Sequence, residues 1–273
     1  MSLSSTWIER IQSLPVLPQV AMRVAERMQS PTATTEEIAS LIRSDAGLTA
    51  KLLKLANSSY YSVPGGVSDV LKALQFLGFN TVAQLVLTSS VFGAFKTQGT
   101  REFPLSGFWI HSFAVGLLSE ITARSLQVAN SSDCFVGGLM HDIGKLVLME
   151  LDPAQLSKIT IHAREHQQGF LASEEALGAV THVQLGSALA QYWKLPGAIS
   201  GAIIGHHREK PESIEATIVS WANQWVHARE LGQSGSFEKR EPVCDLISKS
   251  QEARIEAAFL KEFEKAEAIL HGH

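Results

Sequence analysis

The stretch Gly137-Gly-Leu-Met-His141-Asp142-Ile-Gly-Lys145 decides how the rest of the chain is interpreted. It sets a histidine directly before an aspartate, with apolar residues on either side. Both side chains are common ligands of divalent metals. Neighbouring residues of a helix point about 100° apart. The pair can therefore reach one ion together only from a helix end or a distorted turn, unless it serves two ions.

His111 precedes this pair in the sequence, and His182 and the pair His206-His207 follow it. In a helical bundle, residues at helix ends or beside small residues can converge on one cavity. Neutral imidazoles together with a carboxylate suit Fe, Mn, Zn or Ni, whereas Mg and Ca prefer all-oxygen shells. A single histidine in a helix is more often a core or surface residue, so the prediction depends on the whole set. We predict a site for one or two divalent transition-metal ions held by His111, His141, Asp142, His182, His206 and His207.

Two residues of the opening stretch have a predicted catalytic role, Asp142 and Lys145. A metal centre of this kind can lower the pKa of bound water and polarise a phosphoryl oxygen, which hydrolysis of a phosphate ester requires. Asp142 would belong to that centre. Lys145, one helical turn beyond His141, could pair with the charge of the phosphate. The alternative for Lys145 is that it stabilises the dipole at a helix C-terminus.

Composition and charge limit the classes of function. The chain has 273 residues, with 23 basic and 27 acidic side chains, which gives a net charge of −4. This balance argues against a general nucleic-acid binder, which normally presents a basic face. No signal peptide is visible, no apolar run approaches the ~18 residues of a membrane helix, and the two cysteines lack CxxC spacing. We expect a cytoplasmic protein with neither a nucleic-acid nor a membrane partner, and the oligomeric state stays open.

The pattern of apolar residues predicts an all-α fold. Apolar residues recur at helical spacing, and no segment alternates with a period of two. Pro15 and Pro18 should separate the first two helices, and Thr34 and Asp45 are expected N-caps.

The expected arrangement is two helical lobes. The first spans residues 1–98, and a polar joint at residues 96–104 leads to the second, at residues 105–231. Residues 232–273 complete the chain as a loop and a C-terminal helix. Within that part, the Gly- and Ser-rich residues 232–236 are expected to form an exposed loop.

Several sequence blocks resemble the HDOD domain of the HD phosphohydrolase superfamily, which is related to the HD-GYP type. The resemblance covers about residues 10–230 and depends on the blocks 14–18, 42–58, 73–78, 138–145, 181–186 and 203–207. It implies an all-helical fold whose second lobe is an HD-like bundle. It also implies a bacterial signalling or regulatory role, since most members are proteins of that kind. Many of them have degraded metal sites and no demonstrated reaction.

The resemblance also implies an order of metal ligands, and this chain departs from it at the end. In the HD-GYP type the order is an early His or Glu, then His-Asp, His, His-His and a final Asp. The six predicted ligands match in order, but the last position, expected around residues 219–223, has Asn223. An amide ligates weakly and brings no negative charge. The Gly-Tyr-Pro signature is also absent after the His-His pair, which argues against hydrolysis of a cyclic dinucleotide.

Two hypotheses follow for the function. The first is a bacterial HDOD signalling or regulatory protein with an HD-type His/Asp metal site and without full hydrolase activity. It would bind a phosphorylated small molecule or a signalling protein. The alternative is a metal-dependent phosphohydrolase that acts on a nucleotide or another phosphoester. We favour the first, because function must be argued from an intact site and Asn223 interrupts the ligand set.

Overall fold

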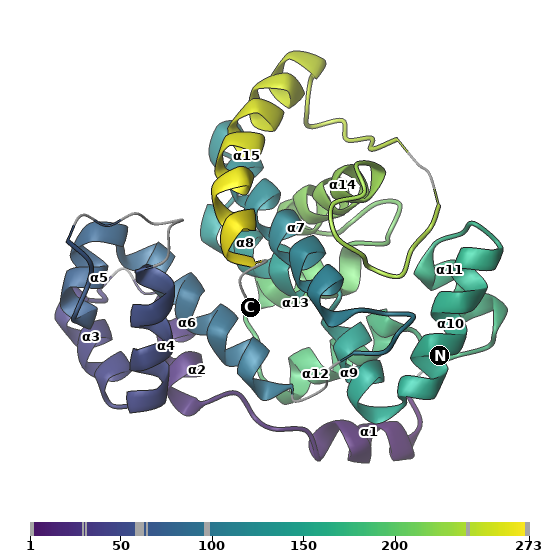
Figure 1. Ribbon diagram of the computed structural model, residues 1–273, viewed down its shortest axis with the longest axis horizontal. Coiled ribbons are helices and arrows are strands. Elements are labelled where there is room, and N and C mark those ends of the chain that lie inside the picture. Colours follow the sequence, from purple (N-terminus) through teal and green to yellow (C-terminus); the bar gives the residue numbers. More distant parts are fainter. Residues whose placement is uncertain are drawn as a thin grey trace. The chain divides into compact units, whose positions relative to one another are not determined.

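The computed structural model describes residues 3–28, 30, 32–57, 63, 65–95, 99–238 and 241–270. Over these residues the chain consists of helices and connecting loops, without a β-strand. The all-α prediction is confirmed. The helices form two compact units, one of Pro15–Phe95 with Glu264–His273 and one of Met1–Leu14 with Lys96–Phe263 (Figure 1).

The smaller unit is built from five consecutive helices: α2 (Gln19–Met28), α3 (Thr35–Arg43), α4 (Ala46–Ala56), α5 (Val70–Leu77) and α6 (Phe79–Ala94). Two of the caps are those that the sequence predicts. Thr34 Oγ1 accepts the Glu37 N–H at 3.2 Å, and Asp45 Oδ1 accepts the Leu48 N–H at 2.9 Å. Ser58, the last residue of the resembling block 42–58, lies outside the described residues.

The larger unit contains α1 (Ser5–Gln12) and the helices from α7 onward: α7 (Leu105–Leu126), α8 (Ser131–Met140), α9 (Ile143–Leu151), α10 (Pro153–Glu165), α11 (Phe170–Ala176), α12 (His182–Tyr192), α13 (Gly197–Gly205), α14 (Ile214–Ala228) and α15 (Lys249–Leu270) as far as Phe263. The long helix α7 packs against α8 and α14. Two glycines allow the backbones of α7 and α8 to approach closely. A Cβ added to Gly138 would lie 2.8 Å from Gly116 Cα.

The first helix belongs to the larger unit, although the sequence places residues 1–98 in one lobe. Helix α1 packs against α12, and Tyr192 Oη donates a hydrogen bond to Gln12 O at 3.0 Å. Ile11 is buried, because this contact covers the apolar stripe of a short helix. Pro15 and Pro18 follow α1 and precede α2, as the sequence predicts.

The segment after α14 is not the exposed loop that the sequence predicts. Ser234 and Gly235 are buried, and the Gln233 N–H donates to Gly107 O at 2.9 Å. Gly232 and Gly235 have positive φ angles of 75° and 78°, a conformation that favours glycine. The prediction was wrong because Gly- and Ser-rich composition fits a tightly packed backbone as well as a solvated one.

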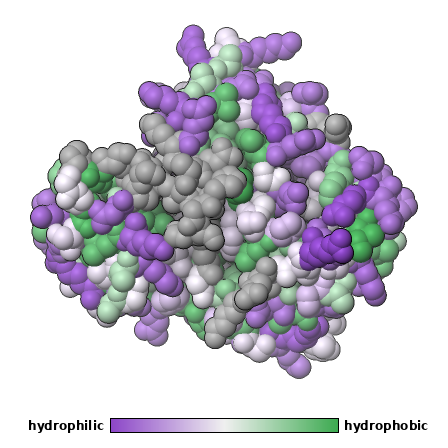
Figure 2. Space-filling view, in the orientation of Figure 1, coloured by the Kyte–Doolittle hydropathy of each residue, from purple (hydrophilic) through white to green (hydrophobic). Residues whose placement is uncertain are grey.

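Hydrophilic side chains cover much of the face seen in Figure 2, and apolar side chains form separate patches between them. None of the described helices combines the length and the apolar character that crossing a membrane requires.

Candidate metal centre

The His-Asp pair lies in a turn between two helices. Helix α8 ends at Met140, and α9 begins at Ile143, so His141 is the C-cap of one helix and Asp142 the N-cap of the next. Both residues are 1% exposed. This is the helix-end geometry that lets adjacent residues face one site.

Glycines bring the neighbouring helices to this turn. A Cβ on Gly144 would overlap the carbonyl oxygen of His182 and lie 2.7 Å from Gly186 N, so α9 contacts the backbone of α12. A Cβ on Gly186 would lie 2.8 Å from Ile203 Cγ2 of α13. The close packing of these three helices places Asp142, His182 and His206 around one point.

Four of the predicted ligands form one compact group: Asp142, His182, His206 and His207. His182 Nε2 lies 3.3 Å from Asp142 Oδ1, 3.4 Å from His206 Nε2 and 3.1 Å from His207 Nε2. His206 Nε2 lies 3.5 Å from Asp142 Oδ1. A tetrahedral ion with bonds of about 2.0–2.1 Å has ligand–ligand edges of about 3.3–3.4 Å. The group therefore has the spacing of a metal coordination shell.

Hydrogen bonds on the far side of the rings determine which nitrogens carry protons. His141 Nδ1 donates to Gly138 O at 2.6 Å, and His206 Nδ1 donates to Ile203 O at 2.9 Å. Because a carbonyl oxygen only accepts, these nitrogens are protonated and the Nε2 atoms of the neutral rings carry lone pairs. His182 has the same arrangement, with Nδ1 donating to Glu174 Oε2 at 2.7 Å.

The lone pairs of Asp142, His182 and His206 face one another. His182 Nε2 and His206 Nε2 cannot form a hydrogen bond while both are acceptors, although they are 3.4 Å apart. Asp142 Oδ1 lies 3.3 Å from His182 Nε2 and 3.5 Å from His206 Nε2, and it is buried without a hydrogen-bond partner among the described residues. Unsatisfied buried acceptors are costly, and a cation between them removes the cost. The residues present therefore fit a divalent metal ion.

The remaining predicted ligands form a second group of His111, His141 and Asp142, which shares Asp142 with the first. Here Asn223 lies beside His111, with His111 Nε2 3.0 Å from Asn223 Oδ1. With the amide oxygen as acceptor, His111 Nε2 carries a proton and cannot bind a metal at that atom. Asn223 thus faces the cluster, at the place where the resemblance implies an aspartate.

Lys145 is buried inside the centre. Its Nζ donates to Asp142 Oδ2 at 2.7 Å and to Ser234 O at 2.8 Å, and the side chain is 2% exposed. Burial alone would raise the pKa of the Asp142 carboxyl, but the positive charge of Lys145 holds that pKa well below its usual range. Lys145 keeps Asp142 ionised for a cation and ties the buried segment at Ser234 to the centre. Its predicted contact with a phosphate stays a prediction.

A cavity of about 1010 Å³ opens beside the centre. Its lining includes His206, His207, Lys145 and Asn223, together with side chains of α14 and of residues 208–213 and 243–246. His207 is exposed, whereas the other three imidazoles nearest Asp142 are buried. The exposed ring marks the side of the centre from which a ligand can approach.

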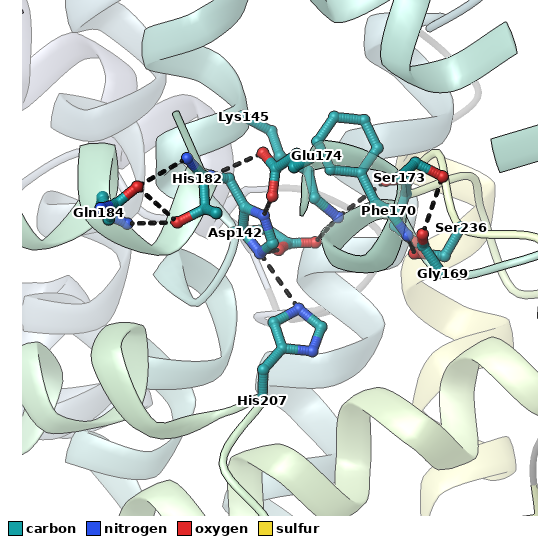
Figure 3. A network of polar contacts seen from close by, with 12 residues as sticks. Asp142, Lys145, Gly169, Phe170, Ser173, Glu174, His182, Gln184, His207 and Ser236 are labelled. Atoms are coloured by element: carbon teal, nitrogen blue, oxygen red, sulfur yellow. Dashed lines mark hydrogen bonds and ion pairs between the residues drawn. The ribbon is translucent and has the colours of Figure 1, made fainter. Parts of the chain in front are cut away.

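Two contributors to the site have no recognisable sequence signal. Glu174 belongs to a pair of glutamates in a short helix, and nothing in its spacing distinguishes it from a solvated residue. Ser234 acts through its backbone carbonyl, which any residue possesses. Figure 3 shows Glu174 beside His182, with His207 and Asp142 at the other end of the ring.

The buried imidazoles make the stability of the metal-free protein depend on pH. Burial lowers the pKa of His206 to about 4 and that of His111 to about 3, from 6.5. Between pH 6.5 and 4 the unfolded chain binds more protons than the folded one, so stability falls as the pH falls, by up to about 1.4 kcal/mol per pH unit and group. In EDTA, the free energy of unfolding measured with urea should fall less from pH 7 to pH 5 for His206→Gln than for the wild type. Equal losses would contradict this.

Comparison with known proteins identifies the class to which this fold and site belong. The sequence profile of the HDOD domain matches residues 14–209. The chain therefore belongs to the HDOD domain family, as its sequence motifs predict.

Individual relatives agree with this assignment. An HDOD domain protein with unknown function from Geobacter sulfurreducens is 25% identical, with a TM-score of 0.76 over 98% of this chain and 96% of that one. A protein from Shewanella amazonensis SB2B named "Putative phosphohydrolase" is 25% identical, with a TM-score of 0.69 over 98% and 95% of the two chains. An uncharacterised protein from Treponema pallidum (strain Nichols) is 25% identical over 229 residues, which are 82% of this chain and 44% of that protein. The chain thus spans less than half the length of this last relative.

Proposed function

We propose that this HDOD protein is a regulatory protein that binds one divalent transition-metal ion and, beside it, a phosphorylated small molecule. The ion would be held by Asp142, His182, His206 and His207. The observation that carries the proposal is the convergence of three buried proton-free acceptors, Asp142 Oδ1, His182 Nε2 and His206 Nε2, at 3.3–3.5 Å from one another. His207 Nε2 lies 3.1 Å from His182 Nε2 and completes the set. Fe, Mn, Ni and Zn all suit this donor set.

Residues around the ligands hold them in position. When bound, the ion would polarise a phosphoryl oxygen and lower the pKa of a bound water. Lys145 holds the Asp142 carboxylate in place, and the backbone carbonyls of Gly138 and Ile203 orient the His141 and His206 rings. The cavity beside His207 has room for the body of the ligand.

Two features favour binding over hydrolysis. Asn223 contributes no negative charge and engages His111, which weakens the second ligand group. Lys145 uses two of its three N–H donors on Asp142 and Ser234, which leaves at most one to stabilise the charge that develops during hydrolysis. We therefore infer a signalling role, with a phosphorylated ligand or a signalling protein as partner. A cytoplasmic location is consistent with the free Cys134 and Cys244.

A metal-dependent phosphohydrolase is the second candidate. The observation that favours it is the open cavity at His206 and His207, which gives a phosphoester access to the four-ligand group. The Shewanella relative named "Putative phosphohydrolase" has a similar fold at 25% identity. A nucleotide or another phosphoester would be the substrate.

One experiment separates the two candidates. Protein loaded with Mn²⁺ or Zn²⁺ is titrated with inorganic phosphate by calorimetry and assayed with p-nitrophenyl phosphate. Phosphate binding that needs the metal, without turnover, supports the regulatory role. Turnover that disappears in Asp142→Ala supports the hydrolase. Neither binding nor turnover in the metal-loaded protein would contradict a site for phosphorylated ligands.

Asn223→Asp is expected to strengthen the second ligand group. A carboxylate at position 223 can ligate the ion directly, and it adds the negative charge that the amide lacks. We expect Zn²⁺ bound per chain to rise from one toward two equivalents, with binding at the second group tighter by on the order of tenfold. Gln224→Glu is the matched control, because it adds the same charge one residue along α14 and lacks the contact with His111. Equal stoichiometry in Asn223→Asp and the wild type would show that residue 223 does not limit the centre.

A further inference from the structure

We propose that Glu174 is a positioning residue of the metal centre, which holds the His182 ring with its Nε2 lone pair directed at the ion. The proposal rests on the metal site proposed above. Both oxygens of the carboxylate bind His182. Oε2 accepts the Nδ1–H at 2.7 Å, and Oε1 accepts the backbone N–H at 2.6 Å (Figure 3).

The position of His182 explains why one carboxylate can make both bonds. His182 is the first residue of α12, after the N-cap Thr181. The first N–H groups of a helix have no partner within the helix, and a negative charge near them is favourable. Glu174 supplies the acceptor for one of them and holds the side chain of the same residue. The ring therefore has little freedom to rotate or to change tautomer.

The burial of Glu174 indicates that a cation should bind at Nε2 of the His182 ring, on the side away from the carboxylate. Glu174 is fully buried, and its ion-pair partner among the described residues is His182. A buried carboxylate is costly unless it is compensated. A metal ion on His182 Nε2 makes the Nδ1–H a stronger donor, and this carboxylate–histidine–metal arrangement is a common way to orient a ligand.

The charges of the buried side chains also favour a bound cation. Among the buried side chains that the structure describes, the acidic ones are Asp142 and Glu174, and the basic one besides histidine is Lys145. The centre therefore has one net negative charge while its histidines are neutral. Glu174 provides a second carboxylate in a cluster where Asn223 is neutral. One divalent cation brings the total to one positive charge, which suits an anionic ligand in the adjacent cavity.

Glu174→Gln tests the proposal with almost no change in shape. Glutamine has one acceptor oxygen for the two N–H groups of His182, and its NH₂ group favours the tautomer with the proton on Nε2. We expect the affinity for Zn²⁺, measured by competition with a chelating dye, to fall 10- to 100-fold. Nitrogen-15 spectra of the metal-free protein should show His182 changing from the Nδ1–H to the Nε2–H tautomer. Glu174→Asp should recover part of the affinity, because it restores the carboxylate.

Glu175→Gln is the matched control, because Glu175 is the exposed neighbour in α11. It should leave both the affinity and the tautomer unchanged. Wild-type Zn²⁺ affinity in Glu174→Gln, or an unchanged His182 tautomer, would overturn the role of Glu174. If the wild type itself takes up no Zn²⁺, the proposed function fails. The tautomer in the metal-free protein still decides whether Glu174 orients His182.

Discussion

Replacing Lys145 with methionine is expected to lower the free energy of unfolding of the metal-free protein by about 3–5 kcal/mol. Methionine fills a similar volume but leaves the Asp142 carboxylate buried, at 1% exposed, without its ammonium partner at 2.7 Å. Removing one member of a buried ion pair is costly because the other charge stays in an apolar environment. Urea unfolding in EDTA measures the effect.

Two further variants show whether loss of the Asp142–Lys145 ion pair causes the lower stability of Lys145→Met. The double variant Asp142→Asn/Lys145→Met removes both charges and should recover part of the lost stability. Lys158→Met, on an exposed position of α10, should change stability by less than about 0.5 kcal/mol. Added Zn²⁺ should stabilise Lys145→Met more than the wild type, because the ion supplies the missing positive charge. A Lys145→Met protein as stable as the wild type would refute this account of Asp142.

Gly144→Ala is expected to destabilise the protein by about 1–3 kcal/mol or more and to weaken metal binding. The new Cβ would overlap the backbone carbonyl of His182 and lie 2.7 Å from Gly186 N, so α9 would have to move away from α12. These two helices bring Asp142 and His182 together. Urea unfolding and Zn²⁺ titration measure the two effects.

Gly201→Ala is the control for this substitution. Gly201 also lies within a helix, but a Cβ there meets only Ser213 Oγ, at an ordinary 3.6 Å. Alanine in a helix interior is favoured over glycine by roughly 0.5–1 kcal/mol, so this variant should be as stable as the wild type or more stable. A stabilising Gly144→Ala would mean that α9 and α12 do not approach as closely as described.

Local signals in the sequence predict much of the fold. Prolines and cap residues act on their own neighbours, so Pro15, Pro18, Thr34 and Asp45 predict the helix ends that the structure has. The buried segment at residues 232–236 could not be predicted in this way. Its environment depends on contacts with Gly107 and Lys145, which are distant in the chain.

The candidate site could also be predicted only in part from the sequence. The order and chemistry of the histidines around His141 and Asp142 suffice to suggest a metal centre. They do not show which ligands share an ion, because that depends on the glycine contacts that bring α9, α12 and α13 together. Glu174 could not be identified because its role comes from burial beside His182, and burial is a property of the tertiary structure.

The central claim is that Asp142, His182, His206 and His207 hold one metal ion. The most direct test is the metal content of protein purified without a His tag, measured by mass spectrometry before and after exposure to Mn²⁺, Fe²⁺, Ni²⁺ or Zn²⁺. We predict close to one equivalent per chain in the wild type and in His166→Ala, which alters an exposed histidine outside the centre. We predict loss of the metal in His182→Ala. A wild-type protein that takes up no metal, or a His182→Ala variant that retains it, would contradict the claim.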